Sequence, residues 1–163
     1  MIETLMIGND HGGYEVKRHL AAHLREKGIE VIDIGCDSDR IVRYPYYARK
    51  VARAVARGEV DRGILICSTG IGMSIAANKV KGVRASVCTS HYMGMMTRRH
   101  NDSNVLCLGG KITGIFEIVD IVDAWISNAY EGGRHDISLG LIADMEDELG
   151  CAVPEDRPIP EEQ

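Results

Sequence analysis

The chain has 163 residues, of which 45% are hydrophobic, 26% charged and 5% aromatic, and its formal net charge is -5. This length and composition are typical of one soluble globular domain with an aliphatic core. The acidic balance argues against nucleic acid as a partner, and a long apolar run that would indicate a membrane-spanning helix is missing. A signal peptide is not recognisable at the N-terminus, so we expect a cytoplasmic protein.

Strand and helix patterns alternate along the chain. In chain order, we predict a strand over residues 5–7, a helix over 14–27, a strand over 30–34, a helix over 45–57 and a strand over 63–67. A helix over 73–80, a strand over 84–88, a helix over 90–99, a strand over 105–108 and helices over 115–128 and 137–149 follow. The alternation predicts an α/β fold: a single-domain, doubly wound, Rossmann-like, five-stranded parallel sheet with helices on both faces.

We expect this domain to occupy residues 1–150. Residues 151–163 contain three prolines and several acidic side chains, which predicts a disordered or loosely attached tail. The cysteines are odd in number and show no Cys-x-x-Cys spacing: Cys36, Cys67, Cys88, Cys107 and Cys151. Reduced thiols are therefore expected instead of a disulfide framework or a zinc site, and we expect neither a metal nor another cofactor.

The loop after the third predicted strand begins with a cysteine and contains two glycines. Gly70 and Gly72 allow a tight turn that exposes main-chain N–H groups, and the next helix directs its positive end at the loop. Cys67 at the start of such a loop is favoured as a thiolate, the reactive form of the side chain. The alternative is that Cys67 is a small core residue at the end of a buried strand.

Known phosphate-binding motifs do not match this loop. A Walker A loop would end in Gly-Lys-Ser/Thr, and a Rossmann fingerprint would have glycine where Ile75 stands. A cysteine phosphatase would carry arginine at the position of Met73. The loop is therefore expected to bind an anion, or to stabilise developing negative charge, without binding a nucleotide.

Three further polar segments lie outside the expected core. Asp10 and His11 follow the first strand, and ligand sites lie outside the carboxyl ends of parallel strands, so both are expected near Cys67. His100 and Asn101 end a helix, where a cap is the simpler interpretation, although imidazole is suited to proton transfer. Arg134 follows two glycines and could make a bidentate phosphate contact, or could belong to a solvated linker.

Together these segments resemble the type B ribose-5-phosphate isomerase family, which includes the galactose-6-phosphate isomerase subunits and the allose-type isomerases. The matching segments occur in family order across residues 2–149: 8–13 (GNDHGG), 44–45 (YP), 63–72 (GILICSTGIG), 76–79 (AANK), 100–102 (HND) and 131–135 (EGGRH).

The resemblance implies metal-free aldose–ketose isomerisation through an enediolate, with ribose 5-phosphate and ribulose 5-phosphate as the expected pair in the pentose phosphate pathway. It assigns Cys67 as the base, His100 to ring opening, and Thr69 to positioning the thiol or relaying a proton. It assigns substrate binding to Asp10, His11, Tyr44, Ser68, Gly70, Ile71, Gly72, Asn101, Lys111 and Arg134. It also implies a homodimer or homotetramer with active sites shared between subunits, and no nucleic-acid or membrane partner.

The sequence departs from the family pattern at three positions that concern substrate recognition. Ser138 replaces a second phosphate-binding arginine, Lys111 replaces an arginine that often contacts substrate, and Arg43 replaces a common aspartate. Three alternatives therefore stay open. They are an isomerase of another aldose phosphate or a free aldose, a phosphocysteine carrier of a sugar phosphotransferase type, and a sugar-binding sensor.

Overall fold

The structure is a computed structural model that describes residues 2–148. These residues form one parallel sheet of five strands in the order β2-β1-β3-β5-β4. The strands are β1 (Thr4–Asn9), β2 (Glu30–Asp33), β3 (Arg62–Cys67), β4 (Ala85–Val87) and β5 (Val105–Gly109). The predicted α/β class and the parallel five-stranded sheet are confirmed.

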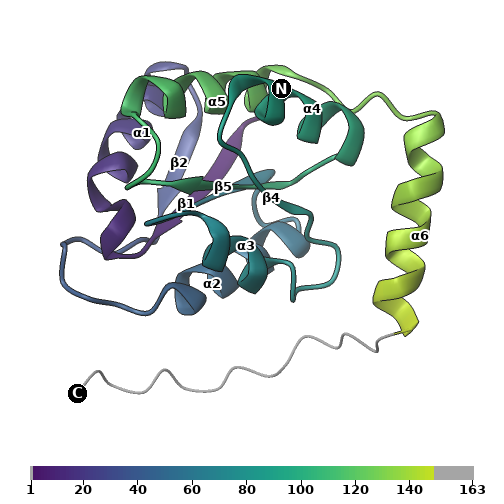
Figure 1. Cartoon of the computed structure of the whole chain (residues 1–163), viewed down its shortest axis with the longest axis horizontal. Helices are drawn as coiled ribbons and strands as arrows, with labels where there is room; N and C mark the ends of the chain where they lie inside the picture. The colour runs from purple at the N-terminus through teal and green to yellow at the C-terminus, as the bar shows by residue number, and fades with distance from the viewer. Residues whose placement is uncertain (1, 149–163) are drawn as a thin grey trace.

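Helices cover both faces of the sheet, as Figure 1 shows. One face carries α1 (Tyr14–Glu26), α4 (His91–Asn101) and α5 (Ile115–Ser127), and the other carries α2 (Tyr44–Ala56) and α3 (Ile71–Ala77). A short 3-10 helix, η1 (His11–Gly13), connects β1 to α1. The last described helix, α6 (Arg134–Glu148), stands to one side of this body.

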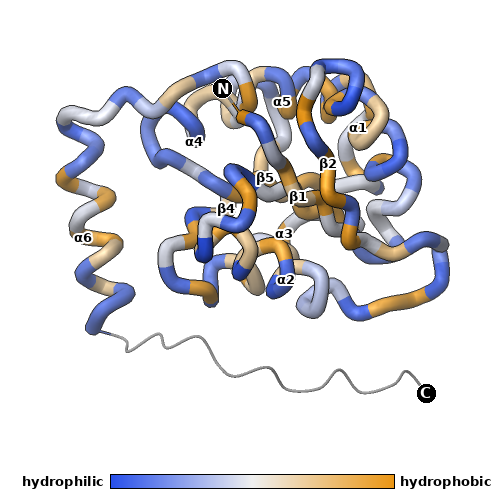
Figure 2. The backbone as a smooth tube through the Cα atoms, turned by 180° about the vertical axis from the view of Figure 1, so that it is seen from behind, coloured by the Kyte–Doolittle hydropathy of each residue, from blue (hydrophilic) through white to orange (hydrophobic). Residues whose placement is uncertain are grey.

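Two apolar layers hold the helices on the sheet, and β3 contributes to both because side chains alternate along a strand. Ile64 and Ile66 pack with residues of α1 and α5, whereas Leu65 and Cys67 pack with residues of α2 and α3. The apolar strands at the centre of the molecule are visible in Figure 2. The alternation directs the Cys67 side chain to the face that α2 and α3 cover.

Helix α4 carries its last residues to the amino edge of the sheet. It begins beyond the carboxyl end of β4 and runs antiparallel to the strands, as a crossover helix must. Arg84, which directly precedes β4, donates from Nε to the main-chain oxygen of Asn101 at 3.0 Å. His100 and Asn101 therefore lie near the start of β4, far from the carboxyl ends of the strands.

Several predicted boundaries differ from the structure. Helix α3 begins at Ile71, two residues before the predicted start, because Gly70 adopts a left-handed conformation (φ 79°) that caps it. The predicted start of the last helix at residue 137 is wrong. Gly132 and Gly133 have φ of 65° and 64°, and α6 begins directly after them, so Arg134 lies in its first turn.

The predicted tail, 151–163, lies outside the described residues. Within residues 2–148, the helices are all too short or too polar to cross a membrane.

Replacing Trp125 should test the α5 layer. Trp125 is fully buried, and its Nε1 donates to Ser103 Oγ at 2.8 Å. Trp125→Ala leaves a cavity and an unpaired hydroxyl, so we expect the free energy of unfolding to fall by about 3–5 kcal/mol in urea denaturation. Phe116 is an aromatic residue of the same helix that is 89% exposed, and Phe116→Ala should change stability by less than about 0.5 kcal/mol. Equal losses in both variants would contradict the packing described.

Candidate active site

Cys67 is the last residue of β3, and it is almost fully buried. The main-chain N–H of Gly70 donates to its Sγ at 3.1 Å. Gly70 must adopt positive φ to form this turn, and a Cβ there would lie 3.0 Å from the main chain of Leu108. The loop therefore requires glycine at this position, and the turn directs a backbone dipole at the sulfur.

The other described thiols have different surroundings. Burial raises the pKa of Cys88 to about 12, and it raises the pKa of Cys107 well above its usual range. Burial also raises the pKa of Cys36, although a hydrogen bond with Ser38 and the charge of Lys17 oppose the rise. These three thiols stay protonated near neutral pH. The Sγ of Cys67, at the carboxyl end of β3, accepts the main-chain N–H of Gly70 instead.

Three loops meet at the carboxyl edge of the sheet beside Cys67. The Asp10 N–H donates to the Ile66 oxygen at 3.1 Å, and the Gly110 N–H donates to the Cys67 oxygen at 2.8 Å. Gly12 lies so close to Ser68 that a Cβ on Gly12 would be 2.4 Å from the Ser68 hydroxyl oxygen. These contacts bring the loops after β1, β3 and β5 together around one thiol, as the strand order predicts.

Asp10 is a buried carboxyl group at the edge of this site. Its Oδ1 accepts the N–H of Gly12 at 2.8 Å and caps η1. Burial raises the pKa of Asp10 above its ordinary value, and the Gly12 hydrogen bond and the neighbouring His11 offset part of that rise. The protein therefore holds a carboxyl group where its ionised form is poorly solvated, which is typical of a functional position.

The imidazole of His11 is fixed by a main-chain contact. The N–H of Val42 donates to His11 Nδ1 at 3.3 Å. Nδ1 must then be the unprotonated nitrogen of the neutral ring, which leaves the proton on Nε2. His11 can thus donate a hydrogen bond to an anion from Nε2.

The remaining predicted residues at this edge surround the start of α3. The Tyr44 ring lies against Gly72, where a Cβ would approach it to 2.8 Å. Thr69 Oγ1 accepts the Ile71 N–H at 3.4 Å, and the Ile71 side chain is exposed. The Lys111 N–H donates to the Ser68 oxygen at 3.0 Å, so Lys111 also joins this loop cluster.

The other predicted residues form a separate group. His100 and Asn101 end α4 near Arg84, and Arg134 begins α6. Ala85, the residue after Arg84, is in register with Val105, and Val105 is in register with Gly63. Cys67 lies four residues beyond Gly63, or about 13 Å along the strand. Within one chain, the structure does not bring His100, Asn101 and Arg134 to the thiol.

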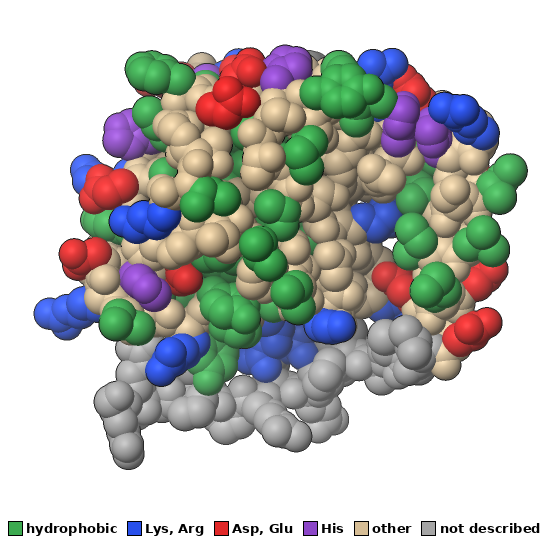
Figure 3. Space-filling model, viewed as in Figure 1, with side chains coloured by type: hydrophobic (Ala, Val, Ile, Leu, Met, Phe, Trp, Pro, Cys, Tyr) green, Lys and Arg blue, Asp and Glu red, His purple; other side chains and the backbone are tan. Residues whose placement is uncertain are grey.

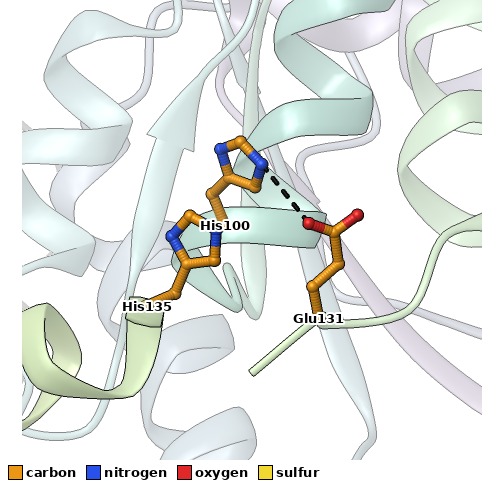
Figure 4. A group of neighbouring side chains, drawn as sticks. All are labelled: His100, Glu131 and His135. Atoms are coloured by element: carbon orange, nitrogen blue, oxygen red, sulfur yellow. Dashed lines mark ion pairs between the residues drawn. The ribbon is translucent and has the colours of Figure 1, made fainter. Parts of the chain in front are cut away.

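The second group contains two side chains that sequence reasoning did not single out, Glu131 and His135. The rings of His100 and His135 stack with centroids 4.1 Å apart and an interplanar angle of 19°. Glu131 Oε2 lies 3.5 Å from His100 Nε2. A dashed line marks this pair in Figure 4. The pattern EGGRH at residues 131–135 marked this segment, but no local signal indicated which of its side chains would meet His100.

Comparison with known proteins decides the family. The model of the protein family described as "Ribose/Galactose Isomerase" matches residues 5–142 of this chain. The chain is 49% identical over 145 residues to ribose-5-phosphate isomerase B of Escherichia coli, covering 89% of this chain and 97% of that protein. The chain belongs to the ribose/galactose isomerase family.

Solved structures agree with this family assignment. Ribose-5-phosphate isomerase B of Clostridium thermocellum superposes with a TM-score of 0.88 at 50% identity, covering 90% of this chain and 99% of that one. The Mycoplasma genitalium ribose-5-phosphate isomerase B, solved with bound ribulose-5-phosphate, gives a TM-score of 0.86 at 38% identity, covering 91% and 99%. The resemblance to type B isomerases is confirmed, and the protein is an aldose–ketose isomerase.

The raised pKa of Asp10 leads to a prediction about stability. Because the carboxyl group holds its proton more tightly in the folded chain than in the unfolded chain, its ionisation at pH 7 destabilises the fold. Asp10→Asn should therefore increase the free energy of unfolding at pH 7. The gain should shrink as the pH falls below the ordinary range of a carboxyl group, where wild-type Asp10 is protonated in both states.

Thermal denaturation between pH 3 and pH 7 measures this effect, and Asp61 provides a control of opposite sign. Hydrogen bonds from the N–H groups of Thr4 and Glu3 lower the pKa of Asp61. Asp61→Asn should therefore destabilise the protein at pH 7. A loss of stability in Asp10→Asn at pH 7 would contradict the interpretation of Asp10.

Proposed function

We propose that the protein interconverts ribose 5-phosphate and ribulose 5-phosphate, with Cys67 as the base that moves a proton between C2 and C1. The hydrogen bond from Gly70 N–H to Cys67 Sγ is the observation on which this proposal depends most, because it stabilises negative charge on that sulfur. The names of the relatives and the ribulose-5-phosphate bound to one of them support this substrate pair.

The reaction begins with the open-chain aldose. The Cys67 thiolate takes the proton from C2, the C1–C2 double bond forms, and the electrons of the C1 carbonyl move onto its oxygen. Main-chain N–H groups of residues 68–72 stabilise that oxygen, as an oxyanion hole does. Thr69 relays the hydroxyl proton from O2 to O1, and the Cys67 thiol gives its proton to C1. The ketose forms and the thiolate is regenerated, without a cofactor.

The other residues of the first group bind the sugar phosphate. Asp10 accepts hydrogen bonds from sugar hydroxyls, and His11 donates from Nε2 to the phosphate. Lys111 adds a positive charge at the mouth of the site, and the Tyr44 ring forms its wall. Ser68, Gly70, Ile71 and Gly72 contribute the loop that surrounds the reacting carbons.

A second copy of the chain completes each site in this proposal. Its His100 opens the sugar ring, its Asn101 binds the sugar, and its Arg134 binds the phosphate. The supporting observation is the distance between the two groups of residues in one chain, about 13 Å along β3. The active species is then a homodimer or a homotetramer, and we place it in the cytoplasm.

Helix α6 offers a surface for this assembly. None of its described residues, Arg134–Glu148, is buried, yet Ile137, Leu141, Ile142 and Met145 are large, apolar and exposed. Figure 3 shows hydrophobic side chains along α6, beside the hollow that separates the helix from the body. That groove has a volume of about 440 Å³ and is lined in part by Leu139, Ile142 and Met145. An exposed apolar surface of this kind favours a protein partner.

The role of Cys67 can be tested by substitution. Cys67→Ala should fold normally and lose roughly 10²–10⁴-fold in kcat for ketose formation from ribose 5-phosphate, because the base is gone. Cys36→Ala and Cys88→Ala should keep their activity, since neither thiol belongs to the site. A fully active Cys67→Ala enzyme would exclude the mechanism. A higher kcat/KM for free ribose than for ribose 5-phosphate would exclude the proposed substrate.

Mixed oligomers can test the shared site. Cys67→Ala and His100→Asn chains should each be weakly active alone. In the proposed dimer, each site takes Cys67 from one chain and His100 from the other. When the two variants are coexpressed, a dimer with one chain of each type therefore has one site that carries both changes and one intact site. For random pairing we expect about a quarter of wild-type activity. If each site were built within one chain, every site in the mixed dimer would carry a change, and the activity would stay at the level of the parents.

A further inference from the structure

Three segments that are separate in the sequence bring potential metal ligands together at the amino edge of the sheet. His100 comes from the last turn of α4, Glu131 from the connection between α5 and α6, and His135 from the first turn of α6. Their ligand atoms all lie within 4.8 Å of one another. The three side chains face one another in Figure 4, and this is the one such group found among residues 2–148.

The group is anchored by contacts that do not use its ligand atoms. The Glu131 N–H donates to the Arg99 oxygen at 3.0 Å, which ties the connection to the end of α4. The Arg99 guanidinium pairs with Glu131 Oε1, which leaves Oε2 facing His100. His100 and Glu131 are both partly open to solvent, with side-chain exposures of 29% and 37%, so an ion can reach them.

We propose that His100, Glu131 and His135 form a binding site for a divalent transition-metal ion, and that an ion bound there inhibits the isomerase. Two imidazoles and one carboxylate form the donor set of zinc sites that keep a fourth position open. Imidazole ligands favour zinc, nickel and copper over magnesium and calcium, which prefer oxygen.

Binding requires a modest rearrangement. Ligand bonds of 2.0–2.2 Å to a tetrahedral zinc ion place the ligand atoms about 3.3–3.6 Å apart, so the group must contract. The lone pair of an imidazole nitrogen lies in the ring plane, and the two planes here are nearly parallel. One ring must therefore turn, and His135 can do so because it is at the partly exposed start of α6. The nearby Arg99 charge opposes a cation, so we expect micromolar affinity.

Inhibition follows from the donor atom that the ion occupies. An imidazole nitrogen bound to a metal can neither accept nor donate a proton. An ion bound at Nε2, the His100 nitrogen that faces Glu131, therefore prevents that nitrogen from moving a proton in ring opening. This part of the inference rests on the role proposed for His100 above. Metal binding itself does not depend on that role.

The binding experiment must exclude thiols as ligands. We would titrate Co²⁺ and Zn²⁺ into the full chain carrying Cys67→Ala and Cys151→Ser, following Co²⁺ absorption and the heat of Zn²⁺ binding. We expect one ion per chain. Adding His135→Asn or Glu131→Gln should weaken binding by about tenfold or more, because losing a ligand costs at least as much as losing a residue that supports one. His23→Asn is the matched control. His23 Nε2 lies 2.7 Å from Asp123 Oδ1, so it also pairs with a carboxylate, but this pair has no second imidazole to complete a metal site.

Activity of the chain with its native cysteines gives the second readout. In EDTA-treated enzyme, added Zn²⁺ should inhibit isomerisation, and His135→Asn should raise the inhibitory concentration about tenfold or more, whereas His23→Asn should not. Absence of binding, or binding that survives both ligand substitutions, would overturn the site. Binding without inhibition would overturn the inhibitory role. Inactivity without Zn²⁺ on every sugar phosphate would instead refute the proposed function.

Discussion

The main-chain hydrogen bonds at the end of β3 are the constraint on which the candidate site depends. Asp10 donates to Ile66, and Gly110 donates to Cys67, so the loops on either side of β3 are fixed to it by backbone contacts. Backbone can approach backbone this closely only without side chains, which explains Gly12 against Ser68. The thiol, the buried carboxyl of Asp10 and the loop amides are thus positioned by the sheet itself, whose strands are rigid elements.

The direction of α4 determines which predicted site residues lie far apart within one chain. A helix that follows a parallel strand returns along the sheet, so residues at its end lie at the edge opposite the strand ends. The thiol and the histidine pair are therefore at opposite edges of the same sheet. The apolar exposed face of α6 extends from the second group of residues. Both features are consistent with sites that two chains build together.

Much of this arrangement could be predicted from local patterns. The alternation of apolar strands with amphipathic helices gave the fold class, and the glycines around Cys67 indicated the loop. The meeting of Asp10 with that loop follows from the general position of sites in parallel sheets. The start of α6 was not predicted, because Gly132 and Gly133 resemble a linker in sequence, whereas their positive φ leads directly into the helix.

The cluster around Glu131 shows the limit of sequence reasoning more clearly. His100 and His135 are 35 positions apart in the sequence, and their ring contact depends on the connection being tied back to Arg99. No periodicity encodes that contact. The burial of Asp10 could not be predicted from the sequence for the same reason, because it results from the packing of loops that are distant in the sequence.

The alternation of side chains along β3 also limits how this protein can change over evolutionary time. Ile66 and Cys67 are adjacent but face opposite layers, one toward α5 and the other toward α3. Deleting or inserting a single residue in this strand would exchange the two faces and turn the thiol away from its loop. Insertions and deletions in homologous genes should therefore be excluded from β3, even where single substitutions among aliphatic residues are accepted.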